Sequence, residues 1–307
     1  MIHLPRTQRH GTCAALRAAL VVVATMCGQV HAATLYVIGQ AATPPAVGNS
    51  TTTFGTIDTV TGAYTQISSA LSGANSVMNL TYNGTDFYVT ENSTAASQNL
   101  RTLTTAGVLS SSIGTTSSRV IGGMAYRNTD GVLYAYSRTN QDYGTISTTD
   151  GSFSLLTNAT AVTMANAMGG RMAMLSGVNY FVNAVVGASS AFGSFNGLTA
   201  GSTWSSIAQN STYQNMVLAS DGVKLYGLVP STSSAATLYS INTTTGALTL
   251  ETNVTASANM PTQFSGAAFA VVPEPSTIAL AFSGIVVMGI GARARRKAKA
   301  AAEAAAA

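Results

Sequence analysis

The stretch LYGLVPSTSSAATLYSINTTTGALTL, residues 225–250, contains three short strand-like runs and one tight turn. Leu225–Leu228 and Leu238–Asn242 mix apolar residues with small or polar ones, which is the pattern of half-buried strands. Thr245-Gly246 follows as a turn, because glycine adopts the positive φ that such turns need. Ala247–Thr252 then continues as a third run. This order predicts antiparallel β structure.

The same order recurs five times along the chain. The aromatic strand of each copy carries one marker residue, and successive markers are separated by 52, 46, 47 and 45 residues. The markers are Tyr36, Tyr88, Tyr134, Phe181 and Tyr226. The strand that follows the glycine turn is expected at Ala63–Ile67, Val108–Ile113, Ser152–Leu156, Ser202–Ile207 and Ala247–Thr252.

A fourth strand precedes four of the five aromatic strands, at Met78–Tyr82, Met124–Tyr126, Met172–Leu175 and Met216–Ala219. Each is joined to the aromatic strand by a dipeptide typical of tight hairpins. These dipeptides are Asn83-Gly84, Asp130-Gly131, Ser176-Gly177 and Asp221-Gly222. The fifth copy, Ser265–Phe269, comes at the end of the body, whereas the first aromatic strand, Leu35–Ile38, has no such strand before it.

These two loose ends fit together in a ring. Four strands per unit, a period of about 45–50 residues and recurrent glycine and aromatic positions are typical of β-propeller blades. We therefore predict an all-β, five-bladed propeller over residues 33–271, closed by pairing of its N- and C-terminal strands. In general form the repeat resembles those of bacterial propeller proteins, without matching one enzymatic family. A β-sandwich and a β-solenoid adhesin are the competing architectures.

The C-terminal segment, residues 272–299, has a different character from the body. Val272-Pro273-Glu274-Pro275-Ser276 is followed by an uncharged run, Thr277–Ala292, and then by Arg293, Arg295 and Arg296. This order resembles the PEP-CTERM sorting signal of Gram-negative, biofilm-forming bacteria. The resemblance implies a transmembrane helix at 277–292, cleavage by an exosortase near the tripeptide, and release to the cell surface or extracellular matrix. An ordinary C-terminal anchor is the alternative, and the Ala-rich end, 300–307, carries no further signal.

The N-terminal residues 1–32 have the layout of a secretory signal peptide. Arg6, Arg9 and Arg17 form a basic region, Ala18–Cys27 is apolar, and Val30-His31-Ala32 ends in small residues. We expect signal peptidase to cut before Ala33 and the protein to be exported through the inner membrane, where the C-terminal helix anchors it transiently.

Composition excludes several chemistries for the body. All three histidines and both cysteines lie in residues 1–32, which leaves the mature protein without either residue type. Thiolate nucleophiles, His-assisted serine catalysis and zinc sites of the usual kind are therefore excluded. From Ala33 to Val272 there are six basic and eight acidic residues, so the body lacks the basic surplus of a nucleic-acid-binding protein. We predict no cofactor and no metal.

Few side chains suggest a binding site. Asp58 and Asn242 precede glycine turns, where hydrogen bonding to backbone N–H groups is the expected role. Glu91 and Asp142 follow aromatic strands and could share one face, although we expect them to be solvated charges. The marker tyrosines are expected between blades, so the candidate ligand surface consists of aromatic residues outside that position: Trp204, Tyr143 and Tyr213.

Two functions remain after this reading. The first is a non-catalytic structural or binding protein of biofilm or exopolysaccharide, with polysaccharide or matrix proteins as partners. The alternative is a polysaccharide-acting hydrolase or lyase on the same scaffold. Two acids that converge with Arg138 or Arg171 in the central channel would favour the enzyme.

Overall fold

The structure is a computed structural model of the chain. It describes residues 34–40, 52–69, 71, 76–92, 97–158, 169–183, 190–231, 235–255, 257, 259–270 and 304. The chain divides into two compact units, one of which is the body, Ala33–Val272. The predicted signal peptide (1–32) and membrane helix (277–292) lie outside the described residues, and none of the helices within those residues has the length and apolarity needed to cross a membrane.

The strands of the described residues form five antiparallel sheets of four strands each. From the inner strand outward, blade 1 contains β20 (Gln263–Ala270), β1 (Thr34–Gln40), β2 (Thr52–Ile57) and β3 (Tyr64–Ser68); blade 2 contains β4 (Val77–Tyr82), β5 (Phe87–Asn92), β6 (Gln98–Leu103) and β7 (Gly114–Thr115); blade 3 contains β8 (Ile121–Arg127), β9 (Val132–Ser137), β10 (Asp142–Ile146) and β11 (Phe153–Asn158); blade 4 contains β12 (Met172–Leu175), β13 (Val178–Asn183), β14 (Ala191–Phe195) and β15 (Trp204–Gln209); blade 5 contains β16 (Val217–Ser220), β17 (Leu225–Pro230), β18 (Ala236–Ile241) and β19 (Leu248–Val254). The predicted five-bladed propeller is confirmed.

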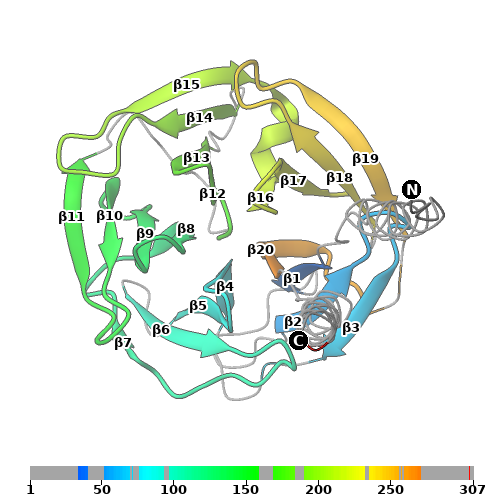
Figure 1. The fold of residues 1–307 in the computed structure, drawn as a ribbon, viewed down its shortest axis with the longest axis horizontal. Helices are drawn as coiled ribbons and strands as arrows, with labels where there is room; N and C mark the ends of the chain where they lie inside the picture. Colours follow the sequence, from blue (N-terminus) through cyan, green and yellow to red (C-terminus); the bar gives the residue numbers. More distant parts are fainter. Residues whose placement is uncertain are drawn as a thin grey trace. The chain divides into compact units, whose positions relative to one another are not determined.

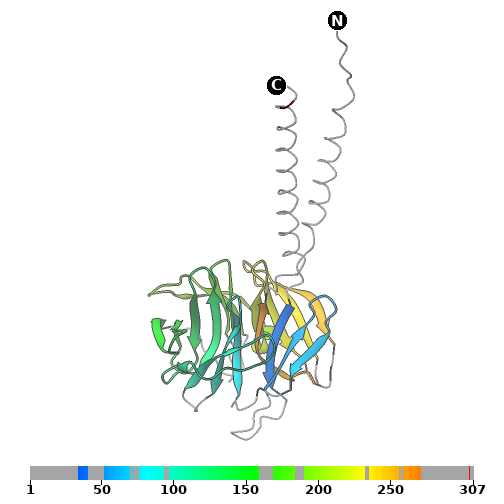
Figure 2. The same cartoon turned by 60° about the horizontal axis from the view of Figure 1, so that its bottom comes forward.

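The blades are arranged as a ring (Figure 1). Strands β4, β8, β12, β16 and β20 surround the centre, and β3, β7, β11, β15 and β19 lie at the rim. Seen after rotation, the strands cross the thickness of the disc (Figure 2). The inner strands are largely buried, whereas the outer strands consist of half-buried and exposed residues, so the core lies in the inner and middle strands.

Both ends of the body meet in blade 1. Strand β20 pairs with β1 in antiparallel register, from Thr34 opposite Ala270 to Gln40 opposite Gln263. The predicted closure of Ser265–Phe269 against Leu35–Ile38 is therefore confirmed. Because a closed ring leaves no unpaired sheet edge between first and last blades, this pairing removes a site of edge-to-edge aggregation.

Apolar side chains fill the spaces between neighbouring blades. The described residues form five buried clusters, and each cluster draws on two adjacent blades, including blades 5 and 1. Aromatic pairs cross these interfaces: Tyr36 contacts Phe87 with 4.9 Å between ring centroids, and Tyr226 contacts Phe269 at the same distance. Three marker tyrosines, including Tyr88 against Tyr126, thus lie between blades as predicted.

Blade 2 departs from the repeat. The strand expected at Val108–Ile113 is absent from this described segment, where the outer strand is the short β7, and Leu109 forms an isolated bridge with Leu103. Ser110 explains the difference, because its hydroxyl accepts a hydrogen bond from the Thr102 N–H (2.9 Å) and donates to the Ser111 carbonyl (2.8 Å). Such local side-chain bonds compete with a regular ladder.

Candidate functional site

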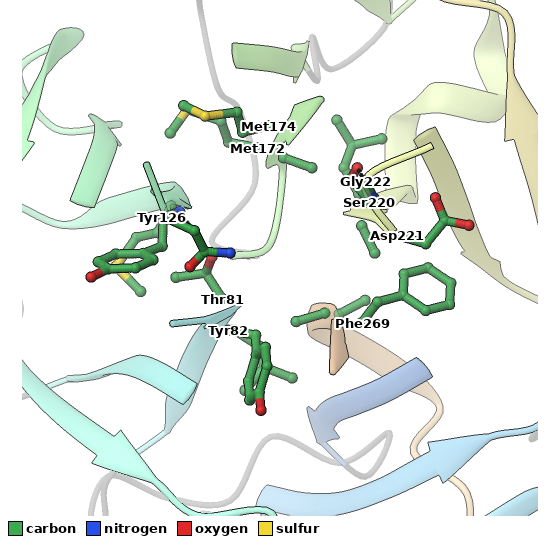
Figure 3. Close-up of a pocket in the computed structure, with 17 residues that line it drawn as sticks. Thr81, Tyr82, Tyr126, Met172, Met174, Ser220, Asp221, Gly222 and Phe269 are labelled. Atoms are coloured by element: carbon green, nitrogen blue, oxygen red, sulfur yellow. Dashed lines mark hydrogen bonds between the residues drawn. The ribbon is translucent and has the colours of Figure 1, made fainter. Parts of the chain in front are cut away.

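A cavity of about 240 Å³ lies in the central channel, at the C-terminal ends of the inner strands. Each of the five inner strands contributes to it, as Figure 3 shows for Thr81, Tyr126, Met172, Ser220 and Phe269. Its walls combine apolar side chains, such as Leu80, Met124 and Leu218, with polar ones, such as Thr81, Asn128 and Ser220. We call this end of the channel the pocket end.

Of the described residues that line this pocket, one is acidic. Asp221 belongs to the turn between β16 and β17, and its Oδ1 accepts hydrogen bonds from the N–H groups of Val223 (2.8 Å) and Lys224 (2.6 Å). Its Oδ2 accepts from the Tyr226 hydroxyl at 3.1 Å. Burial, reinforced by the Asp221 charge, raises the pKa of Tyr226, so this phenol stays protonated. The carboxylate is therefore engaged in holding its own hairpin.

The opposite end of the channel is crossed by the backbone that leads into β12. The Gly170 N–H donates to Asn79 Oδ1 (2.8 Å), the Leu218 N–H donates to the Gly170 carbonyl (2.7 Å), and the Arg171 N–H donates to the Gly122 carbonyl (3.3 Å). A Cβ atom on Gly170 would lie 2.8 Å from the Cα of Gly266. Blade 4 thus contacts all four other blades here. We call this the crossed end.

Asn79 connects three blades at the crossed end. It is fully buried with a positive φ of 55°, at an irregularity in β4. Its Nδ2 donates to Thr90 Oγ1 (2.8 Å) within blade 2 and to the Ile121 carbonyl (3.0 Å) of blade 3, while its Oδ1 accepts from Gly170. The sequence did not reveal this role. Asn79 begins one of several Asn-x-Ser/Thr triplets in the chain, and nothing in its local sequence sets it apart from the others.

The two acids expected to share a face are both buried, not solvated. Glu91 forms an ion pair with Arg101, with 2.7 Å between Oε2 and Nε. Asp142 forms an ion pair with Arg119, with 3.0 Å between Oδ2 and Nη2. Because each carboxylate has a cation of its own, their geometry is that of structural ion pairs.

The prediction of an exposed ligand surface is wrong for two of its three residues, Tyr143 and Tyr213. Tyr143 is 0% exposed and stacks on Phe195 with 4.0 Å between ring centroids. Tyr213 is 1% exposed and lies in the short 3₁₀ helix η1 (Ser211–Asn215), where its hydroxyl donates to the Gly246 carbonyl. Neither ring can serve as an exposed platform for a sugar.

Trp204 is half-buried and is the first residue of the outer strand β15, a position whose role recurs in other blades. A Cβ on Gly193 would lie 2.7 Å from Trp204 Cε2, so the indole covers the glycine of the neighbouring strand. Tyr64 covers Gly55 and Phe153 covers Gly144 in the same way. The first residue of the outer strand thus covers a glycine in blades 1, 3 and 4, a role that accounts for Trp204 without a ligand.

The residues expected to make turns do so. Asp58 Oδ1 accepts from the N–H groups of Val60 (2.8 Å) and Thr61 (2.9 Å), and Asn242 Oδ1 makes the equivalent bonds in blade 5. The bonds to Thr61 and Val60 lower the pKa of Asp58. No group of three or more acids, histidines or cysteines in the described part of the chain could hold a metal ion.

The PEP-CTERM protein-sorting motif matches residues 271–297. The match includes Pro273, Glu274 and Pro275 as well as Arg293, Arg295 and Arg296, all of which lie outside the described residues. The motif implies an exported protein that an exosortase sorts to the surface or the extracellular space. It covers a small part of the chain and leaves the chemistry of the propeller open.

No curated protein matches the sequence. Among solved structures, an engineered GH43 glycoside hydrolase has a TM-score of 0.50 at 9% identity, with 80% of this chain and 53% of the other covered. A chain of a nidogen/laminin complex follows at 0.48 and 8% (77% and 98% covered), and a 6-phosphogluconolactonase-like protein of Bacteroides fragilis at 0.44 and 11% (79% and 99% covered). This chain spans about half of the hydrolase, and the likeness shows the fold alone.

Proposed function

We propose that this protein is a non-catalytic structural or binding component of the biofilm or exopolysaccharide matrix. The sorting motif supports a destination at the surface or outside the cell. After processing, the weakly charged propeller remains there as the working part of the molecule, and we expect polysaccharide or other matrix proteins to be its partners.

The observation that carries a non-catalytic role is the chemistry of the central pocket. Hydrolysis of a glycosidic bond generally uses two carboxyl groups about 5–10 Å apart across the substrate. The described pocket lining supplies one acid, Asp221, and both of its oxygens accept hydrogen bonds from its own hairpin. Neither Arg138 nor Arg171 lines this pocket, so the convergence that would favour an enzyme is not seen there.

The size of the pocket also favours limited contact. Pockets for small ligands usually measure about 300–1,000 Å³, and this one is smaller. An extended polysaccharide could insert only an end group between its walls, which are polar as well as apolar. We therefore expect a matrix polymer to bind through such an end, or over the rim of turns that surrounds the mouth.

A sorting experiment tests the destination. The variant Pro273→Ala/Glu274→Ala/Pro275→Ala, expressed in a host that carries an exosortase, should remain uncleaved and be retained in the inner-membrane fraction. The matched control, Glu303→Ala, alters the Ala-rich end and should be processed like the unaltered protein. Normal release of the tripeptide variant would refute exosortase sorting through this motif.

A binding and turnover experiment tests the role. The body, residues 33–271, contains all five blades and their closing strand, so it can be screened on a glycan array and incubated with the glycans that it retains. We expect retention without new reducing ends, and Asp221→Asn should behave like the unaltered body. Turnover that disappears in Asp221→Asn would establish the hydrolase alternative, and absence of retention would restrict the protein to a structural role.

A further inference from the structure

Arg171 is a buried cation with an unused guanidinium. The residue is 0% exposed, and none of its three side-chain nitrogens has a hydrogen-bond partner among the described residues. Its backbone is already fixed, because its N–H donates to the Gly122 carbonyl and its carbonyl accepts from the Val182 N–H (3.0 Å). The side chain is therefore not required for the path of the chain at the crossed end.

An isolated buried cation is among the least favourable groups in a folded protein. Burial lowers the pKa of Arg171 to about 10, which leaves the group charged at neutral pH. Retaining this charge inside the fold requires compensation by an opposite charge or by hydrogen-bond acceptors.

The described acids do not supply that compensation. Glu91 and Asp142, the two buried carboxylates, pair with Arg101 and Arg119. Asp58 and Asp221 accept backbone N–H groups in their own turns, and Lys224 pairs with Glu251. We therefore infer that the group that compensates the charge of Arg171 comes from outside the described residues.

Other unsatisfied polar atoms lie at the same end of the sheet. Asn183 is the last residue of β13 and follows Val182, whose N–H donates to the Arg171 carbonyl. Asn183 also pairs with Ala191, the first residue of β14, and Ser190 directly precedes Ala191. The Ser190 hydroxyl and Asn183 Oδ1 are buried without partners in the described structure, as is Nε of Arg138 at the end of β9. Because side chains alternate between the two faces of a sheet, this pairing places Ser190 on the same face of blade 4 as Arg171 and Asn183 on the opposite face.

We propose that Arg171 forms the base of a binding site for a small oxyanion, a carboxylate or a phosphate group, at the crossed end of the channel. The guanidinium presents a planar set of donors that matches two oxygens of such a group. The Ser190 hydroxyl, on the same face of blade 4, provides a further donor. The site is separate from the pocket and does not depend on the proposed matrix role.

Thermal unfolding of the purified exported protein tests the site. Sodium phosphate, sodium glucuronate and sodium chloride are compared at pH 7 and equal ionic strength. A ligand that binds only the folded state raises Tm in a saturable, concentration-dependent way. We expect such a rise with phosphate, glucuronate or both, and its loss in Arg171→Met, which keeps the length of the side chain without its charge.

Two further variants make the result specific. Arg127→Met removes an arginine paired with Asp130 at the pocket end and should keep the full anion response. Arg171→Lys keeps the charge without the paired donors and should reduce the response. If Arg171→Met does not fold, Arg171→Lys and the titration of the unaltered protein by calorimetry carry the test.

The outcomes separate clearly. A response to phosphate alone or to glucuronate alone identifies the group, and a response to both supports the shared chemistry. The proposal is overturned if the unaltered protein responds to neither anion beyond chloride, or if Arg171→Met responds as strongly. Retention on the glycan array has no bearing on either result.

Discussion

The two ends of the central channel are built differently. At the pocket end, the turns are held by bonds within one hairpin, as in the Asp221 turn of blade 5. At the crossed end, single residues join several blades, as Asn79 does for blades 2, 3 and 4. The pocket end can therefore change its side chains with little effect on the ring, whereas the crossed end holds the blades together.

Two glycines with similar backbones give the sharpest test of this difference. Gly170 at the crossed end and Gly177 at the pocket end have φ of +74° and +78°, but a Cβ on Gly170 meets Gly266, while a Cβ on Gly177 meets nothing within 4 Å. Gly170→Ala should lower the free energy of unfolding by about 2–5 kcal/mol, from strain and overpacking together. Gly177→Ala should cost about 1–2 kcal/mol, from strain alone. Urea unfolding measures both, and equal losses would contradict the proposed division.

Two asparagines provide the next comparison. Asn79→Ala leaves the buried Gly170 N–H without an acceptor and places alanine at positive φ, so we expect a loss of about 2–4 kcal/mol. Asn83, in the β4–β5 hairpin of the pocket end, accepts from the N–H groups of Thr85 and Asp86. Asn83→Ala should cost about 1 kcal/mol, since water can replace these exposed bonds. If Asn83→Ala lowers the free energy of unfolding more than Asn79→Ala does, the contacts that hold the blades together lie at the pocket end and not at the crossed end.

The acid of the pocket should have a smaller effect. Asp221→Ala removes the acceptor of two backbone N–H groups and should cost about 1 kcal/mol. Asp221→Asn keeps an acceptor oxygen, so its unfolding free energy at pH 7 should stay within about 0.5 kcal/mol of the unaltered protein. If Asn is as damaging as Ala, the charge of Asp221 matters and the assignment to turn chemistry fails.

The smallest effect concerns pH and the turn between β10 and β11. Hydrogen bonds from Ser147 and Ser152 lower the pKa of Asp150 to about 2, below its value of about 4 in the unfolded chain. A lowered folded-state pKa gives stability that is present above pH 4 and is lost as pH falls towards 2. Asp150→Asn, which keeps an acceptor oxygen without the charge, should abolish this part of the acid sensitivity. Unfolding at pH 6 and pH 2.5 measures the change, and an unchanged acid loss in the variant would exclude Asp150 as its source.

The sequence predicts the blades well because their signals are local. Alternation within strands and a glycine in each turn are visible over a few residues, and the recurrence from Tyr36 to Tyr226 multiplies them. The closing strand was also predictable, because the first repeat, at Leu35–Ile38, has no inner strand before it and the last inner strand, Ser265–Phe269, has no repeat after it.

The features that sequence reasoning missed depend on distant contacts. Asn79 and Gly170 meet across the channel although 91 residues separate them, and neither has an unusual local pattern. Tyr143 and Tyr213 were predicted to be exposed because they fall outside the marker positions, yet the spaces between blades bury them as well. The cover of Gly193 by Trp204 had a readable signal, because Tyr64 and Phe153 also follow glycine turns at their strand starts.

Closure through blade 1 also has a consequence for biogenesis. Of the described strands, β1 is the first to be synthesised, and its inner neighbour β20 is the last and ends directly before the sorting motif. Until β20 is made, one edge of β1 stays unpaired and open to wrong partners, and pairing across such a long loop is slow. A nascent chain that stalls before residue 263 therefore cannot close its ring. Such an unfinished molecule lacks both β20 and the sorting motif that follows it.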